Sequence, residues 1–232
     1  MTPLVLAVAA GAAALLGFAV GWVSAYLAER LQPAEDTAAI RGRGRLVRDP
    51  FVQAGLAIVW AAIPVVLNAD PPTRWLEAGV LAVPLVQVTV TDFRTRYVYS
   101  VVAAAGLALG LAFGWHFHAA PSLGSAAPSL GSAAPWLGSI VGAAGGALAF
   151  GALYGIGRLI YRGGEPMARG DITIAAMVGA EAAACAAQAL VLGVLLGGVL
   201  ALIVWAVSRS RHAFMPYGPG LCLGGLVTLF TC

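Results

Sequence analysis

The sequence has no lysine and few charges of either sign, since only 10% of its 232 residues are charged. A soluble globular domain has about 25% charged residues. No polar stretch is long enough to fold alone, which excludes a large soluble domain. Cysteine is also scarce, and Cys185, Cys222 and Cys232 lack the CxxC spacing of a zinc or haem site. We therefore expect no metal site and interpret the cysteines as small core residues.

Apolar residues are abundant, at 60% of the chain, and the mean hydropathy is +0.89. Apolar segments of membrane-spanning length recur from end to end. The sequence thus predicts an all-α, polytopic membrane helix bundle in which residues 1–232 form a single integral membrane domain. About eight spans are expected, with the sixth running into the seventh through Gln188. Whether those two form one kinked hairpin stays open. The predicted spans are 3–28, 51–68, 75–92, 98–117, 136–160, 171–186, 188–208 and 216–231.

The 13 basic residues are all arginine, and they are distributed unevenly between the predicted connections. If eight spans alternate, all of them except Arg74 fall on one side of the membrane. Arginine-rich connections face the cytoplasm. We therefore expect a multi-pass protein of the inner (plasma) membrane with both termini outside. Because the arginines lie between spans, their excess reflects topology and does not indicate a nucleic-acid partner. The residues on the predicted cytoplasmic side are Arg30, Arg41, Arg43, Arg45, Arg48, Arg94, Arg96, Arg158, Arg162, Arg169, Arg209 and Arg211.

Two connections are long enough to consider separately. The short Arg-rich loop 29–50 is predicted to be cytoplasmic, and its arginines would set topology and contact anionic lipid headgroups in the bilayer. Docking of acidic substrate or partner surfaces is the alternative. Loop 118–139 is predicted to lie outside, and it repeats Pro, Gly, Ser and Ala with prolines at 121, 128 and 135. Proline and glycine in every unit are incompatible with a helix, so this segment is interpreted as a linker.

Two aspartates stand at the ends of long apolar runs. Asp92 follows the run 85–91, and Asp171 precedes the run 172–177, so the predicted topology puts both at the cytoplasmic membrane edge. Carboxylates at membrane depth are costly and usually functional. Two carboxylates a few ångströms apart share one proton, so one takes a proton from water while the other polarises a peptide carbonyl. The alternatives are a solvated charge beside Arg94 for Asp92 and an ordinary helix N-cap for Asp171.

Three glycines precede or adjoin the second aspartate, namely Gly163, Gly164 and Gly170. Glycine adopts positive φ angles and permits close approach of another backbone. An extended substrate strand is therefore predicted to lie there, and a plain flexible loop is the alternative. Glu181 falls at the predicted outer end of the sixth span, where we expect it to be solvated.

Four segments, in this order, resemble the type IV prepilin peptidase family, the GxGD-type membrane aspartyl proteases. Gly17-Phe-Ala-Val-Gly21 resembles the start of the family's first helix, and Asp92-Phe-Arg-Thr-Arg96 resembles its first aspartate motif. Ala168-Arg-Gly-Asp171, running into an apolar helix, resembles its second aspartate motif. Met215-Pro-Tyr-Gly-Pro219 resembles its C-terminal span. The ordered set is more specific than any one segment.

The resemblance implies an aspartic-type endopeptidase that uses Asp92 and Asp171, without metal or organic cofactor, to remove the leader of a prepilin-like membrane protein. Such an activity serves type IV pilus assembly, protein secretion or DNA uptake, and the sequence leaves these three open. The sequence departs from the family at Ala168 in place of the first glycine, at Thr173 in place of lysine, and at Tyr99 and Ser100 in place of Pro-Asn.

A second departure concerns methylation of the cleaved product. Family members with that activity carry paired CxxC motifs in the first cytoplasmic loop, whereas loop 29–50 contains no cysteine. A zinc subdomain is therefore not expected, and the sequence gives methylation no support. Two alternative functions remain: a small transporter with the aspartates as ion ligands, or an inactive peptidase paralogue.

Overall fold

The computed structural model describes residues 2–31, 50–95, 98–117, 136–160, 167–208 and 217–232. These residues form helices and turns and contain no strand, so the predicted all-α fold is confirmed for them. The helices are α1 (Pro3–Leu31), α3 (Pro50–Val66), α4 (Pro72–Thr95), α5 (Ser100–Phe117), α6 (Trp136–Ile160), α7 (Arg169–Ala182), η2 (Ala183–Cys185), α8 (Ala186–Ser208) and α9 (Tyr217–Thr231). Loops 32–49 and 118–135 lie outside the described residues.

The break between the sixth and seventh predicted segments is not at Gln188. Helix α7 ends at Ala182, and Ala183 has φ 44°, a left-handed conformation that is strained for a residue with a Cβ. The Ala183 N–H donates to the Gly179 carbonyl, which closes the end of α7. Gln188 is an exposed residue within α8. The chain therefore turns five residues earlier than the polarity of Gln188 suggested.

Four stretches are long and apolar enough to cross a membrane, namely Pro3–Leu31, Pro72–Arg94, Trp136–Ile160 and Arg169–Val207. Three further apolar helices are shorter, at Pro50–Val66, Ser100–Gly114 and Tyr217–Thr231. Large aliphatic side chains are exposed along the outer helices, including Leu15 of α1, Leu159 of α6 and Val207 of α8, at 76%, 79% and 82%. Lipid, not water, is the solvent in which so much exposed apolar surface is stable.

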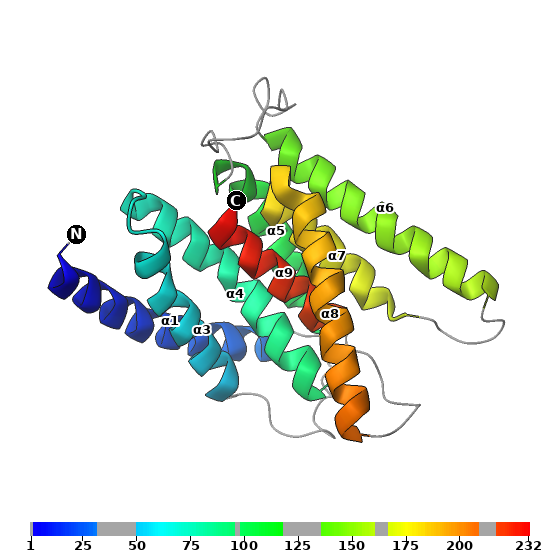
Figure 1. Cartoon of the computed structure of the whole chain (residues 1–232), viewed down its shortest axis with the longest axis horizontal. Helices are drawn as coiled ribbons and strands as arrows, with labels where there is room; N and C mark the ends of the chain where they lie inside the picture. Colours follow the sequence, from blue (N-terminus) through cyan, green and yellow to red (C-terminus); the bar gives the residue numbers. More distant parts are fainter. Residues whose placement is uncertain (1, 32–49, 96–97, 118–135, 161–166, 209–216) are drawn as a thin grey trace.

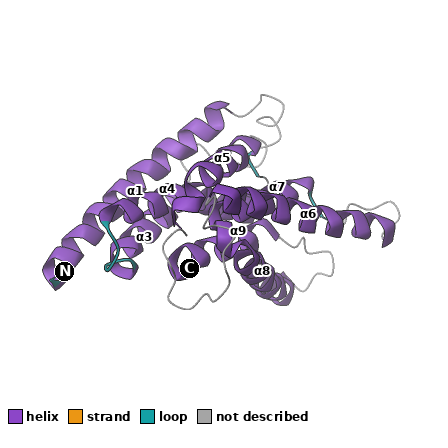
Figure 2. Ribbon diagram, turned by 90° about the horizontal axis from the view of Figure 1, so that it is seen from above, coloured by secondary structure: helices purple, strands orange, loops and turns teal. Residues whose placement is uncertain are grey.

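Helix α9 lies at the centre of the bundle (Figure 1). It contacts α4 on one side and α7 and α8 on the other, while α1 and α3 pack together beyond α4, and α6 packs against α7. Seen from above, α1 and α6 extend along opposite flanks of this centre (Figure 2). Helices α4, α7 and α9 each contribute fully buried side chains to the core, such as Leu85, Val178 and Leu221. These three helices also hold the candidate site.

Helices α8 and α9 approach each other closely because glycines face glycines. A Cβ on Gly224 would overlap the Ala189 carbonyl oxygen and lie 2.6 Å from the Gly193 Cα, and a Cβ on Gly220 would overlap Gly197. Lipid tails are as apolar as side chains, so helices in membranes gain association energy from this kind of close backbone packing. The α8–α9 pair therefore forms one closely packed unit.

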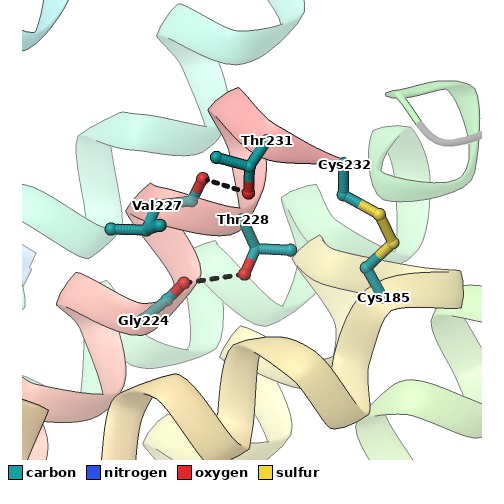
Figure 3. The surroundings of a disulfide bond; sticks show 6 residues. All are labelled: Cys185, Gly224, Val227, Thr228, Thr231 and Cys232. Carbon is teal, nitrogen blue, oxygen red and sulfur yellow. Dashed lines mark hydrogen bonds between the residues drawn. A yellow bond between two sulfur atoms is a disulfide. The ribbon is translucent and has the colours of Figure 1, made fainter.

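One disulfide joins Cys185, at the end of η2, to Cys232, the residue after α9 (Figure 3). The Thr228 and Thr231 hydroxyls in the last turns of α9 donate to the Gly224 and Val227 carbonyls at 2.8 and 3.0 Å. The interpretation of all three cysteines as small core residues is therefore wrong for this pair. Only Cys222 is a fully buried free thiol.

Candidate active site

Asp92 lies in the last turns of α4, and its side chain is buried, with 6% of the residue exposed. The Arg94 side chain points to a different side of α4 from the Asp92 side chain, since residues two apart on a helix do not face each other. The Arg94 guanidinium lies over the Phe51 ring of α3, 4.7 Å from the ring centroid. The alternative interpretation of Asp92 as a solvated charge in a basic turn is therefore wrong, because the structure buries it.

Asp171 is also buried, at 7% exposure, and it lies in the first turn of α7. The N-cap of α7 is Ala168, and the Asp171 N–H donates to the Ala168 carbonyl at 3.1 Å. Asp171 is thus the third residue of the helix and not its cap, which makes the N-cap alternative wrong. Its carboxyl group lies where the partial positive charge of a helix N-terminus is felt most strongly.

Gly218, in the first turn of α9, lies between the two helices that carry the aspartates. A Cβ on Gly218 would overlap Oδ2 of Asp92 and lie 2.9 Å from Cδ1 of Ile174, which is one turn after Asp171 on α7. The absence of a side chain therefore brings α4, α7 and α9 together at this point. It also places the Asp92 carboxylate beside the turn of α7 that follows Asp171. Gly218 lies in the segment Met215–Pro219 that resembles the family's C-terminal span, but nothing in the sequence indicated this contact.

The residues packed next to the aspartates are weakly polar, and those one turn further into the bundle are apolar. The Thr89 hydroxyl of α4 donates to the Leu85 carbonyl at 2.7 Å, and the Cys222 thiol of α9 is fully buried. Further along α9, a Cβ on Gly225 would lie 3.2 Å from Leu85 and 3.3 Å from Val178. The two acids therefore rest on a packed core at the end of the bundle where α4 ends and α7 begins.

The structure describes only one of the three glycines that were predicted to allow approach of the substrate backbone. Gly163 and Gly164 lie outside the described residues. Gly170 is helical, as the second residue of α7, so its φ is not in the left-handed region. No atom of the described residues lies within 4 Å of the place where its Cβ would be. The expected positive φ is therefore wrong at Gly170, while its role in substrate approach stays a prediction.

Two of the residues that depart from the family pattern, Thr173 and Tyr99, lie in different surroundings. Thr173 is exposed on the outer side of α7. Tyr99 is buried in the core, and its carbonyl accepts the N–H groups of Val102 and Ala103 at 3.0 and 3.1 Å at the start of α5. Neither substitution removes a group from the pair formed by Asp92 and Asp171.

Glu181 was expected to be solvated, and this expectation is wrong, because only 1% of the residue is exposed. It lies on the same face of α7 as Asp171. Counted from Asp171, Ile174 is three, Val178 seven and Glu181 ten residues further along the helix. Ten residues correspond to about 15 Å of helix. Among the described residues no group forms a hydrogen bond with either carboxylate oxygen. An acidic residue near a predicted span end carries no sequence signal that distinguishes a buried from a solvated side chain.

The described residues contain no cluster of three or more His, Cys, Asp or Glu side chains able to hold a metal ion. Comparison with known proteins adds no further assignment: the chain matches no protein-family model, no curated protein and no solved structure.

Proposed function

We propose that this protein is a membrane-embedded aspartic-type endopeptidase that removes the leader peptide of type IV prepilin-like proteins at the cytoplasmic membrane face. The observation that carries the proposal is the burial of two aspartates at one end of the bundle, Asp92 from α4 against Gly218 of α9, and Asp171 from α7 one turn before Ile174, which Gly218 also approaches. A packing role alone does not account for two like-charged side chains gathered in an apolar bundle, because carboxylates at such depth are costly.

The arrangement suits acid–base hydrolysis of a peptide bond. The ionised carboxylate takes a proton from water, and the oxygen of that water attacks the peptide carbonyl carbon. The protonated carboxyl group donates its proton to the carbonyl oxygen, which gives a neutral tetrahedral diol. The diol then collapses, the C–N bond breaks, and the leaving nitrogen receives a proton from the pair. The roles of acid and base are shared between Asp92 and Asp171 without assignment.

The substrate chemistry follows from the surroundings of the aspartates. The exposed apolar flanks of the bundle suit a substrate whose own helix lies in the bilayer. The open backbone at Gly170 gives an extended segment of that substrate access beside Asp171. Two acidic groups at the same end attract the basic residues of a short leader. The family resemblance adds the prepilin class to this description.

Topology is part of the proposal: eight spans, with the N-terminus outside and the aspartates facing the cytoplasm. The arginine distribution supports this orientation. The disulfide supports it independently, since Cys232 is at the opposite end of the 15-residue helix α9 from Gly218, about 20 Å away. Disulfides persist in oxidising compartments, so the Cys185–Cys232 end would face outside.

The experiment is reconstitution of the purified full-length chain in liposomes with a prepilin-like substrate, with leader loss followed on a gel. Asp92→Asn and Asp171→Asn keep the side-chain size and should each lower the cleavage rate about 10²–10⁴-fold. Glu77→Gln, a change at a half-exposed acid of α4, is the matched control and should retain cleavage. A chelator should have no effect. Cleavage that survives both aspartate changes would refute the proposal.

One observation favours the alternative of a small transporter. Intramembrane acids commonly mark ion pathways, and Glu181 is an acid buried inside the bundle. Ion flux into liposomes that depends on Asp92 and Asp171, without proteolysis, would select this alternative.

A further inference from the structure

Helix α1 packs against the bundle through one narrow face of small residues. Gly17, Gly21, Ala25 and Ala28 are its buried residues, and a Cβ on Gly17 would lie 2.6 Å from the Leu56 carbonyl oxygen of α3. The helix extends along the flank of the bundle, so its other faces are not covered by neighbouring helices (Figure 2). One of these exposed faces combines aromatic side chains with an arginine.

Trp22, Tyr26 and Arg30 form a continuous row on this face, each one turn after the last. The Trp22 and Tyr26 rings are stacked, with centroids 6.0 Å apart and planes inclined by 10°. The Arg30 guanidinium carbon lies 5.3 Å from the centroid of the Tyr26 ring. Residues four apart on a helix are neighbours, and a cation is attracted to the face of an aromatic ring. The three exposed side chains therefore hold one another in a fixed arrangement.

Arg30 presents a positive charge at the end of the row. The residue is exposed, and among the described residues it forms no ion pair. A guanidinium carries five N–H donors in a planar fork that matches the oxygens of a phosphate group. Because the contact with Tyr26 orders this side chain in advance, an anion bound there would lose less affinity to side-chain ordering.

The row continues as apolar surface toward the N-terminus of α1. Phe18 lies one turn before Trp22 and is 49% exposed, and Leu15, two turns before Trp22, is 76% exposed. The 15 residues from Leu15 to Arg30 correspond to about 22 Å of helix. Half of a bilayer, headgroups included, is about 20 Å thick. The face therefore spans one leaflet, with a cation at the headgroup level and apolar surface below it.

Charge and shape together favour a lipid over the other possible occupants. A soluble phosphate would use Arg30 and leave the aromatic row uncovered. A second copy of this chain in the same membrane orientation would bring its own Arg30 to the same level, where the two charges would repel. The proposed topology also puts every arginine except Arg74 on this side, so the occupant must be anionic. Anionic phospholipids are the membrane component with that charge.

We propose that this face of α1 is a binding site for an anionic phospholipid, with the phosphate at Arg30 and an acyl chain along Tyr26, Trp22 and Phe18. The site is separate from the aspartate pair and does not depend on the proposed peptidase activity. The Gln87 amide of α4 donates to the Ser24 carbonyl of α1 at 3.4 Å, so the lipid-covered helix is tied to the bundle. Bound lipid would therefore favour the folded bundle.

The test is thermal unfolding of the purified full-length protein in neutral detergent micelles that contain phosphatidylglycerol or phosphatidylcholine, at constant ionic strength. Phosphatidylglycerol at about ten times its Kd should raise Tm by about 3–6 °C above phosphatidylcholine, and the shift should saturate. Arg30→Gln should weaken phosphatidylglycerol binding about tenfold, and Trp22→Leu should weaken it about threefold. Arg158→Gln, at an exposed arginine in the last turn of α6, is the matched control and should bind as the wild type does.

Native mass spectrometry of the retained lipid gives a second measurement for any variant with a low Tm. Equal Tm values in the two lipids would overturn the proposal. Equal losses in Arg30→Gln and Arg158→Gln would indicate diffuse attraction to the whole surface, which also overturns it. So would a shift caused by inorganic phosphate alone, or a dimer that Trp22→Leu dissociates without any lipid preference. Asp92→Asn should lose leader cleavage yet keep the lipid shift, which separates this site from the proposed peptidase.

Discussion

Gly218 in α9 lies directly against the carboxylate of Asp92 in α4, and no other residue type fits there without displacing that carboxylate. The same glycine is in contact range of Ile174, which follows Asp171 by one turn of α7. One residue without a side chain therefore lets α9 approach both helices that carry the acids.

Gly218→Ala should lower leader cleavage about 10²-fold, because an added Cβ would overlap Asp92 Oδ2 and shift the acid by a fraction of an ångström or more. Initial rates in liposomes measure the effect. Gly198→Ala on α8 is the control, since no atom of the described part of the chain lies within 4 Å of its Cβ position. Equal rates for the two variants would mean that Asp92 need not hold this position.

Gly170→Ala should separate stability from activity. Alanine is favoured over glycine in a helix by about 1 kcal/mol, and the added Cβ would meet no atom of the described residues, so Tm should stay equal or rise. If a substrate backbone lies beside Asp171, the same Cβ should lower kcat/KM about tenfold. Unchanged cleavage in this variant would remove Gly170 from the substrate path.

Gly224→Ala should destabilise the bundle by about 1–3 kcal/mol, because its Cβ would overlap the Ala189 carbonyl of α8 and the backbone of Gly193. Thermal unfolding in detergent provides the measurement. Gly197→Ala serves as the matched change on the same interface, since its Cβ would meet Gly220 at an ordinary 3.7 Å. A similar Tm for both variants would contradict the close α8–α9 packing.

Loss of the disulfide through a paired Cys185→Ser and Cys232→Ser change should cost about 2–4 kcal/mol, because the bond closes a long loop of the unfolded chain. Urea or thermal unfolding measures this loss.

The same bond gives a test of orientation. In intact cells, an impermeant reductant followed by an impermeant maleimide should label the wild-type protein from outside. Labelling only after the membrane is opened would place Cys185 and Cys232 on the cytoplasmic side and would reverse the proposed topology.

The amino-acid sequence by itself determined the helices of this protein. Long apolar runs bounded by arginine, proline and glycine lead to α1, α4 and α6 within a few residues of the predicted limits, because a helix is the structure that satisfies every backbone group in an apolar solvent. The same runs made Asp92 and Asp171 conspicuous, since a carboxylate in such a sequence contrasts with everything around it.

Only the tertiary structure decided what surrounds each side chain. Asp92 and Glu181 both adjoin apolar sequence. Asp92 has Asp171 nearby, whereas Glu181 has no hydrogen-bond partner among the described residues. Cys185 and Cys232 are 47 residues apart and meet only because α8 and α9 pack antiparallel. Contacts between distant segments depend on how helices cross. Crossing is set by close approach at residues such as Gly218 and Gly224, which hydropathy does not distinguish from any other glycine.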